Sequence, residues 1–235
     1  MSDKNWREWV FIFWMFAIIQ WLILMHIATL FYAGGNLIQP GASGFSFRYN
    51  FFSDLGFCTA HSGRDNTVSC TLWFIASILE HLAFIFIAIA IPYFFKESML
   101  EKRLSTIGSI FLIMSQIYFL FFYSVYNNQE PFIGLLSIFS LLNWLIFTPI
   151  IIILYAIALY HSKEFPNRIA VVFLIPNVFF YISLVVGLLL VGPLTSDTTN
   201  LEVLMFWAVQ EKIYLYVQWP SFFYIAYMFW KKAKS

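Results

Sequence analysis

The chain has 235 residues, of which 61% are hydrophobic and only 11% are charged, and its formal net charge is +1. Soluble domains carry about 25% charged residues, so this composition excludes an ordinary soluble fold and indicates an integral membrane protein. A charge so close to zero, without a basic tract, predicts no nucleic-acid partner.

Six apolar runs are long enough for spanning helices, which need about 20 mostly apolar residues each. They predict an all-α, polytopic membrane protein, a six-transmembrane-helix bundle that forms a single membrane domain over residues 1–235. The expected spans are residues 9–32, 71–95, 104–126, 132–160, 169–191 and 203–230.

The distribution of Lys and Arg predicts the orientation, because cytoplasmic segments next to membrane helices carry an excess of these residues. Ten lie on one side of the expected spans and three on the other. Both termini are therefore expected to be cytoplasmic, and the 37-residue loop 34–70 is expected to be extracytoplasmic. The ten are Lys4, Arg7, Lys96, Lys102, Arg103, Lys163, Arg168, Lys231, Lys232 and Lys234, and the three are Arg48, Arg64 and Lys212.

Cys58 and Cys70, the only cysteines, both lie in this loop. An oxidising exterior favours a disulfide between them, which would close a short loop. Two free thiols are the second interpretation. The third is a metal site that uses Cys58, His61 and Cys70, although zinc ligands usually come in tighter pairs, and we expect no metal.

The loop also carries a dense polar string. Ser53, Asp54 and Gly56 predict a turn, because short polar side chains bond to nearby backbone amides and glycine accepts positive φ. As a functional alternative, the Asp54 carboxylate would bind a cation or orient a lipid headgroup, and a flanking arginine would pair with it or with a phosphate. The candidate binding residues are Asn50, Ser53, Asp54, Arg48 and Arg64.

The same residues resemble a known pattern. Asn50-x-x-Ser53-Asp54-Leu55-Gly56, followed by Ser62-Gly63-x-x-Asn66-x-x-Ser69 and an apolar helix, is similar to a six-helix membrane protein family of unknown function. That family is itself distantly similar to the Frag/DRAM/Sfk group, which includes a GPI-anchor lipid-remodelling factor. The resemblance covers the first loop and otherwise only the number and hydropathy of the spans. It implies a six-helix fold and a membrane location.

Ionisable groups within spans are costly and usually face the bundle interior. His26, Glu80 and His81 fall in the outer halves of the first two expected spans, and Glu211 and Lys212 fall near the outer end of the last one. Together with Asp54, the first three are the candidate catalytic residues, as acid and base in an outward-facing polar pocket. The structural alternative is that Glu80 bonds to His26, Gln116 or Lys212 and holds the bundle together.

Three functions remain open. The default is a lipid-interacting protein or an assembly or trafficking factor, with membrane lipids and proteins within the membrane as partners and no cofactor. The alternatives are a membrane enzyme acting on lipid headgroups and a small-solute or proton transporter that uses Glu80. We further expect residues 50–56 to cover a polar pocket that contains Glu80 and one of His26 and His81, because a carboxylate in a bilayer needs a partner or water.

Overall fold

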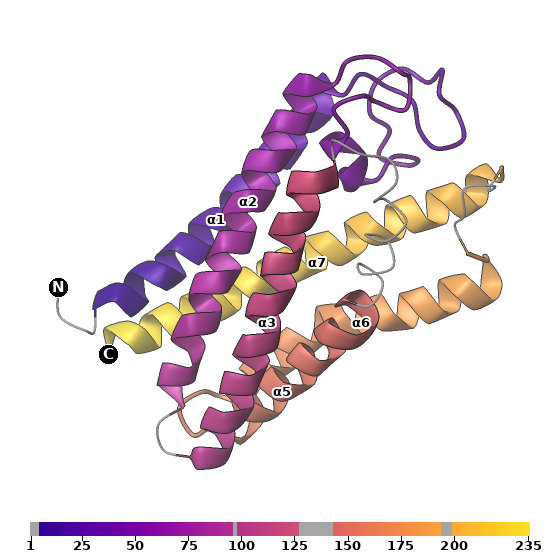
Figure 1. Ribbon diagram of the computed structural model, residues 1–235. Helices are drawn as coiled ribbons and strands as arrows, with labels where there is room; N and C mark the ends of the chain where they lie inside the picture. Colours follow the sequence, from indigo (N-terminus) through magenta and orange to yellow (C-terminus); the bar gives the residue numbers. More distant parts are fainter. Residues whose placement is uncertain (1–4, 96–97, 127–142, 194–198) are drawn as a thin grey trace. The chain divides into compact units, whose positions relative to one another are not determined.

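The computed structural model describes residues 5–95, 98–126, 143–193 and 199–235, and in these ranges the protein is all-α, without a sheet (Figure 1). Two 3-10 helices, η1 and η2, and a short π-helix accompany the α-helices. The α-helices are α1 (Asn5–Phe31), α2 (Thr67–Ala90), α3 (Met99–Tyr126), α5 (Thr148–His161), α6 (Arg168–Leu190) and α7 (Leu201–Lys234), and the short helices are η1 (Phe52–Gly56), η2 (Ile91–Phe94) and the π-helix Asn143–Phe147.

Four stretches in these ranges are long and apolar enough to cross a membrane, which indicates an integral membrane protein. They are Trp6–Phe31, Thr67–Phe94, Met99–Leu120 and Arg168–Leu190. The stretch Leu145–His161 is apolar but shorter, and residues 132–142 of the expected fourth span lie outside the described residues. The long helix α7 is more polar, since it contains Glu211 and Lys212. The spanning roles of α5 and α7 therefore stay predictions.

The chain divides into two compact units, and α1, α2, α6 and α7 contribute residues to both. Unit 1 comprises Met1–Ile18, Ile78–Ile175 and Ser221–Ser235, and unit 2 comprises Ile19–Ser77 and Pro176–Pro220. The single membrane domain expected from the sequence stays a prediction.

Aromatic packing forms the core of unit 1. The ring of Phe229 lies 5.2 Å from Phe11 and 4.4 Å from Phe165, centroid to centroid, and all three side chains are buried. Elsewhere in the unit, the Ser109 and Tyr155 hydroxyls hydrogen-bond at 2.8 Å between α3 and α5. Buried polar pairs of this kind hold membrane helices together.

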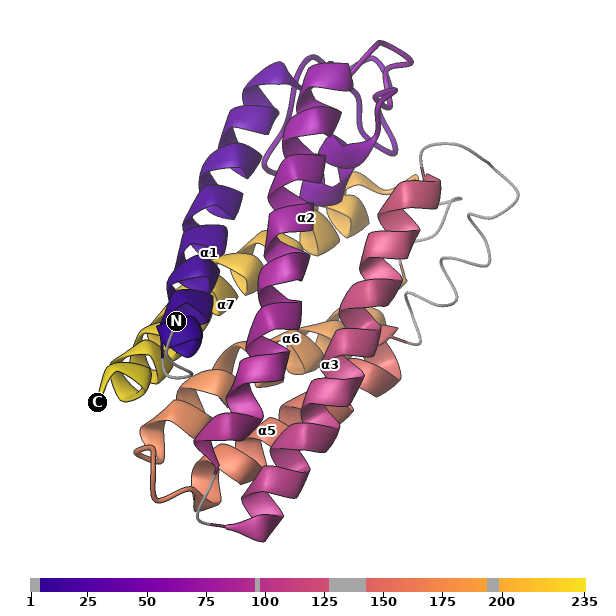
Figure 2. The same ribbon diagram turned by 60° about the vertical axis from the view of Figure 1, so that its left-hand side comes forward.

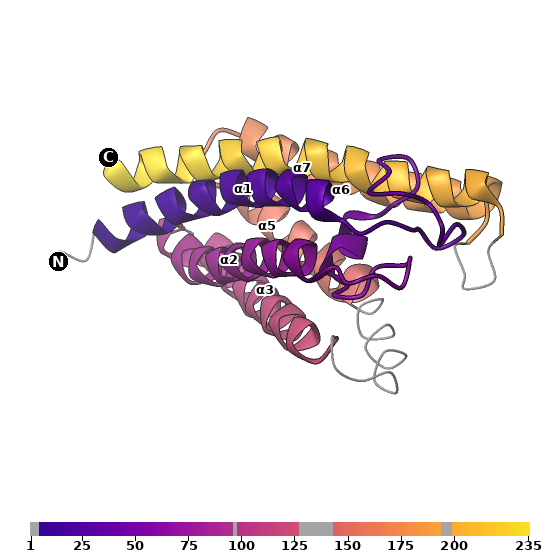
Figure 3. The ribbon, with the colours of Figure 1, turned by 90° about the horizontal axis from the view of Figure 1, so that it is seen from above.

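In unit 2, the segments of α6 and α7 run alongside one another, as the orange ribbons in Figure 3 show. Gln210 donates a 2.8 Å hydrogen bond to the Ser183 hydroxyl, and the Trp207 indole donates to the Gly192 carbonyl. Gly187 makes this approach close, because a Cβ there would stand 2.4 Å from the Phe206 ring.

Residues 32–66, here called the α1–α2 segment, fold back over the ends of the two helices that they connect (Figure 2). Below the segment, the Gln20 amide donates a 3.0 Å hydrogen bond to the Ala76 carbonyl and links α1 to α2. The expected long, ordered loop between the first two helices is thus present, and unit 2 contains the candidate binding residues.

Candidate functional site

Two consecutive glycines let the α1–α2 segment fold against itself. Gly34 and Gly35 have φ of 102° and 83°, a region that side-chain-bearing residues rarely adopt. The Gly34 carbonyl accepts the Ser62 N–H at 3.1 Å, and the Gly35 N–H donates to the Ala42 carbonyl at 2.8 Å. A Cβ on Gly35 would lie 2.5 Å from the Ser62 nitrogen, so the turn around Ser62 can approach only a glycine here.

Asp54 lies in η1, is 5% exposed and is enclosed by hydrogen-bond donors. Its Oδ2 accepts the Asn50 amide at 2.9 Å and the Phe51 backbone N–H at 3.0 Å. Its Oδ1 lies 3.2 Å from His61 Nε2. The turn that Ser53-Asp54-x-Gly56 predicts is therefore present, as a 3-10 helix whose first turn the Asp54 carboxylate caps.

Asn50 is the second buried polar residue of the motif, with 1% of its surface exposed. Its amide nitrogen also donates to the Gly35 carbonyl at 2.8 Å, and its oxygen accepts the Ser46 N–H at 3.0 Å. These bonds connect η1 to the glycine pair. The side chain therefore organises the backbone of the segment.

His61, which the sequence suggests only as a metal ligand, is the partner of Asp54. Its side chain is 24% exposed, against 7% for that of Asp54. Because an ionised carboxylate only accepts hydrogen bonds, Nε2 is the donor of this bond, and in the neutral ring Nδ1 is then the nitrogen able to accept one. In the described part of the chain, Nδ1 has no hydrogen-bond partner. The pair is thus an imidazole that a buried carboxylate orients.

Helix α7 holds the segment through two adjacent charged residues. Lys212 is 5% exposed, and its ammonium donates to the Asn50 carbonyl and, at 2.9 Å, to the Ala208 carbonyl. It also lies 5.4 Å and 5.7 Å from the centroids of the Phe52 and Phe45 rings, within the range of cation–π attraction. A buried lysine is costly unless it has such partners, so this contact is specific to the folded segment.

The neighbouring Glu211 makes the second contact. Its Oε2 accepts the Phe52 N–H at 2.8 Å, at the start of η1. The sequence places Glu211 and Lys212 near the outer end of the last span, and it suggests Lys212 only as one possible partner of Glu80. Two adjacent charged residues in an otherwise apolar run indicate that both have specific partners. Those partners lie about 160 residues away in the chain, so the sequence does not identify them.

Tyr32 follows the last residue of α1 and is 4% exposed. Burial raises the pKa of its phenol well above the ordinary value, and the negative charge of Asp54 raises it further. Tyr32 therefore stays neutral over the physiological pH range and cannot act there as a base.

His26 is bonded within unit 2, but not to Asp54. Its Nδ1 donates to the Leu22 carbonyl at 2.6 Å, and its Nε2 accepts the Tyr216 hydroxyl proton at 2.8 Å. Its ring centroid lies 6.0 Å from that of Phe52. The histidine thus joins α1 to α7 next to the aromatic side chains of the segment, as expected of a polar group that links helices.

Glu80 and His81 belong to unit 1. The His81 side chain is 7% exposed, its Nδ1 lies 2.6 Å from the Gln116 amide oxygen, and its ring stacks on Phe119 with centroids 5.2 Å apart. Glu80 is half-buried. The structure therefore pairs His81 with α3, and the pocket expected between residues 50–56 and Glu80 stays a prediction.

The remaining candidates face outward. Ser53, Arg48 and Arg64 are exposed, and neither guanidinium pairs with Asp54. Arg64 donates weakly to the Ser62 hydroxyl at 3.3 Å and lies over Gly34, whereas the Arg48 side chain has no hydrogen bond or ion pair in the described ranges. Of the five candidate binding residues, Asn50 and Asp54 are therefore internal, whereas Arg48 is exposed and has no partner among the described residues.

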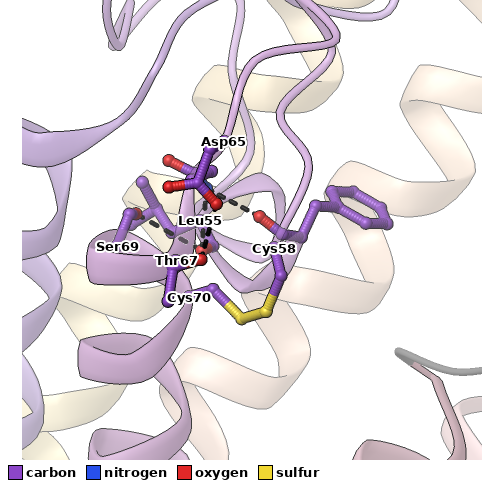
Figure 4. The surroundings of a disulfide bond; sticks show 8 residues. Leu55, Cys58, Asp65, Thr67, Ser69 and Cys70 are labelled. Carbon is purple, nitrogen blue, oxygen red and sulfur yellow. Dashed lines mark hydrogen bonds between the residues drawn. A yellow bond between two sulfur atoms is a disulfide. The ribbon is translucent and has the colours of Figure 1, made fainter.

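A disulfide joins Cys58 to Cys70 with a Cα–Cα distance of 5.1 Å, which confirms the favoured interpretation (Figure 4). It ties the residues after η1 to the first turn of α2. Nearby, the Asn66 N–H donates to the Cys58 carbonyl at 2.9 Å. Because the sulfurs are bonded to each other, no thiolate is left for the metal site considered above. Within the described residues, no three His, Cys, Asp or Glu side chains are grouped to hold a metal.

Comparisons with protein-family models, with curated proteins and with solved structures found no match to this chain. The buried members of the site form one hydrogen-bonded system that orders the segment, and its exposed members are the cations Arg48 and Arg64 and the imidazole edge of His61.

Proposed function

We propose that this chain is a multi-pass membrane protein with six spans that binds lipid through its α1–α2 segment, and that it acts as a lipid-binding, assembly or trafficking factor. The observation that carries the proposal is the contrast between the buried and the exposed side chains of the segment. The amide and carboxylate of its motif are occupied by internal bonds, while a cation and an apolar ring remain exposed.

Arg48 is the centre of this surface. Its guanidinium has no partner in the described ranges, and Phe47 beside it is 47% exposed although its ring also contacts Phe45 and Phe52. A guanidinium matches the oxygens of a phosphate, and an exposed ring next to it favours the apolar edge of the headgroup region. Membrane lipids are accordingly the proposed partner, with proteins of the same membrane as further partners.

The proposal also includes the orientation of the chain in the membrane. With both termini in the cytoplasm, the α1–α2 segment faces the extracytoplasmic side, where oxidising conditions maintain the disulfide. We also propose the relationship to the six-helix family that the motif Asn50-x-x-Ser53-Asp54-Leu55-Gly56 suggests.

The test uses a photoactivatable phospholipid in vesicles that contain the purified protein. We expect crosslinks to the peptide around Arg48, and a several-fold lower yield in Arg48→Gln. Arg103→Gln, which removes another exposed arginine, from α3, is the matched control and should leave the yield unchanged. Crosslinks that are the same in both variants would contradict the proposal.

The Asp54–His61 pair supports a second candidate, an enzyme acting on lipid headgroups. A carboxylate-oriented imidazole with a free nitrogen can remove a proton from water or from a hydroxyl group. The purified protein is incubated with a mixture of phospholipids, and the released headgroups are measured by mass spectrometry. His61→Gln should then abolish any release that the wild-type protein shows. Release that survives this substitution, or that wild type does not show, argues against an enzyme.

A further inference from the structure

Two chain segments far apart in sequence meet at one end of unit 1. The connection between α5 and α6 packs against the last turns of α7, where the Phe165 and Phe229 rings lie 4.4 Å apart (Figures 1 and 2). Glu164 and Lys232 form an ion pair across the same contact. The contact between the buried Phe165 and Phe229 rings therefore brings the basic residues of both segments to the same end of unit 1.

Four further cations of these segments are exposed. Glu164 is the only acidic residue in the sequence of either segment, and Lys232 neutralises it. The other four have no ion pair or side-chain hydrogen bond in the described ranges. They are Lys163, Arg168, Lys231 and Lys234, called here the basic surface.

Aromatic side chains lie just before the cations on both helices. Tyr160, in the last turn of α5, is 56% exposed, and Tyr227, in α7, is 42% exposed. Trp230 follows Tyr227, and the Lys234 ammonium lies 5.4 Å from its ring. Exposed aromatic rings followed by lysines are typical of the headgroup level of a membrane. A soluble phosphate or an acidic protein would need the cations but not the rings.

We propose that the basic surface binds the phosphate of an anionic phospholipid. The Lys and Arg side chains contact the phosphate oxygens, and the rings of Tyr160 and Tyr227 lie against the upper acyl chain. Clustered basic residues at the end of a membrane helix attract anionic lipid, and each contributes about fivefold to the affinity. This inference rests on the proposed membrane insertion and is independent of lipid binding by the α1–α2 segment.

The test measures binding of phosphatidylglycerol and phosphatidylcholine to the full chain by native mass spectrometry from detergent. Wild type should prefer phosphatidylglycerol. The double variant Lys163→Gln/Lys231→Gln should bind it at least about tenfold more weakly, with phosphatidylcholine binding unchanged. Excess soluble glycerol phosphate should not compete, because it lacks the acyl chains.

The matched control is Lys102→Gln/Arg103→Gln, which removes the same charge from exposed positions at the start of α3. It should change phosphatidylglycerol binding less than twofold. Equal losses in both double variants, no preference in wild type, or competition by glycerol phosphate would each overturn the inference. If lipid crosslinking does not depend on Arg48, the proposed role of the α1–α2 segment is refuted. Phosphatidylglycerol binding by the basic surface is a separate result that this outcome does not affect.

Discussion

The buried amide of Asn50 connects the turn at Ser46, the carbonyl of Gly35 and the carboxylate of Asp54. Replacing Asn50 by Ala leaves these buried groups without a partner, and each such group costs about 1–3 kcal/mol. We therefore expect Asn50→Ala to lower the midpoint of thermal unfolding in detergent by about 4 °C or more. Ser53→Ala, at an exposed position of the same motif, should have no measurable effect. Equal shifts in the two variants would show that the amide bonds do not stabilise the segment.

Gly56 is packed directly against an aromatic ring. A Cβ at this position would lie 2.6 Å from the Trp73 ring, which is itself buried. Gly56→Ala should thus destabilise the protein by about 1–3 kcal/mol through overpacking. Gly41→Ala, where a Cβ would meet nothing within 4 Å, provides the control. The unfolding midpoint of each variant is measured relative to wild type, and an unchanged midpoint for Gly56→Ala would contradict the close packing of Gly56 on Trp73.

At the scale of elements, the disulfide anchors the residues after η1 to α2. Its cysteines are 12 positions apart, and closing a loop of this length stabilises a protein by about 3 kcal/mol in the chain-entropy model. We expect reductant to lower the unfolding midpoint of wild type but not of the Cys58→Ser/Cys70→Ser variant. Alkylation without reductant should label neither cysteine of the wild-type protein, and labelling of both would contradict the disulfide.

The α3–α5 contact offers a second test at this scale. Tyr155→Phe removes the partner of the buried Ser109 hydroxyl, and such bonds between membrane helices contribute about 0.6–2 kcal/mol. Tyr160→Phe, at an exposed position on α5, should be neutral. A double-mutant cycle with Ser109→Ala isolates the bond, and a coupling energy of zero would show that it does not join the two helices.

Helix positions were predictable because an apolar run of spanning length has few other structures available to it. The helices α1 and α2 extend beyond the starts of the apolar runs at 9–32 and 71–95, because they begin at the polar residues Asn5 and Thr67. The turn at Asp54 was also predictable, since its bonds to Asn50 and Phe51 are local. The contact of Lys212 with the segment joins residues 162 positions apart, so residue spacing does not encode it. His61 is only seven residues from Asp54, but it comes into contact through the turn that follows η1, which the motif does not specify.

For the whole molecule, the sharpest prediction concerns orientation. The asymmetry of Lys and Arg predicts that both ends of the chain are cytoplasmic and that the α1–α2 segment is on the other side. Its disulfide supports that side, because cysteines pair stably where the environment is oxidising. The four exposed cations of the basic surface lie on the predicted cytoplasmic side.

A topology reporter placed after Ser235 should therefore be active in the cytoplasm, and the same reporter inserted after Gly41 should be active outside it. Gly41 is suited to the insertion because it is exposed and a Cβ added there would meet no other atom within 4 Å. In the six-span arrangement, one span precedes Gly41 and five lie between Gly41 and Ser235. Because five is an odd number, the two reporters must lie on opposite sides of the membrane. Signals from the same side would mean that α5 or α7 does not cross the membrane, and the six-span arrangement would then be wrong.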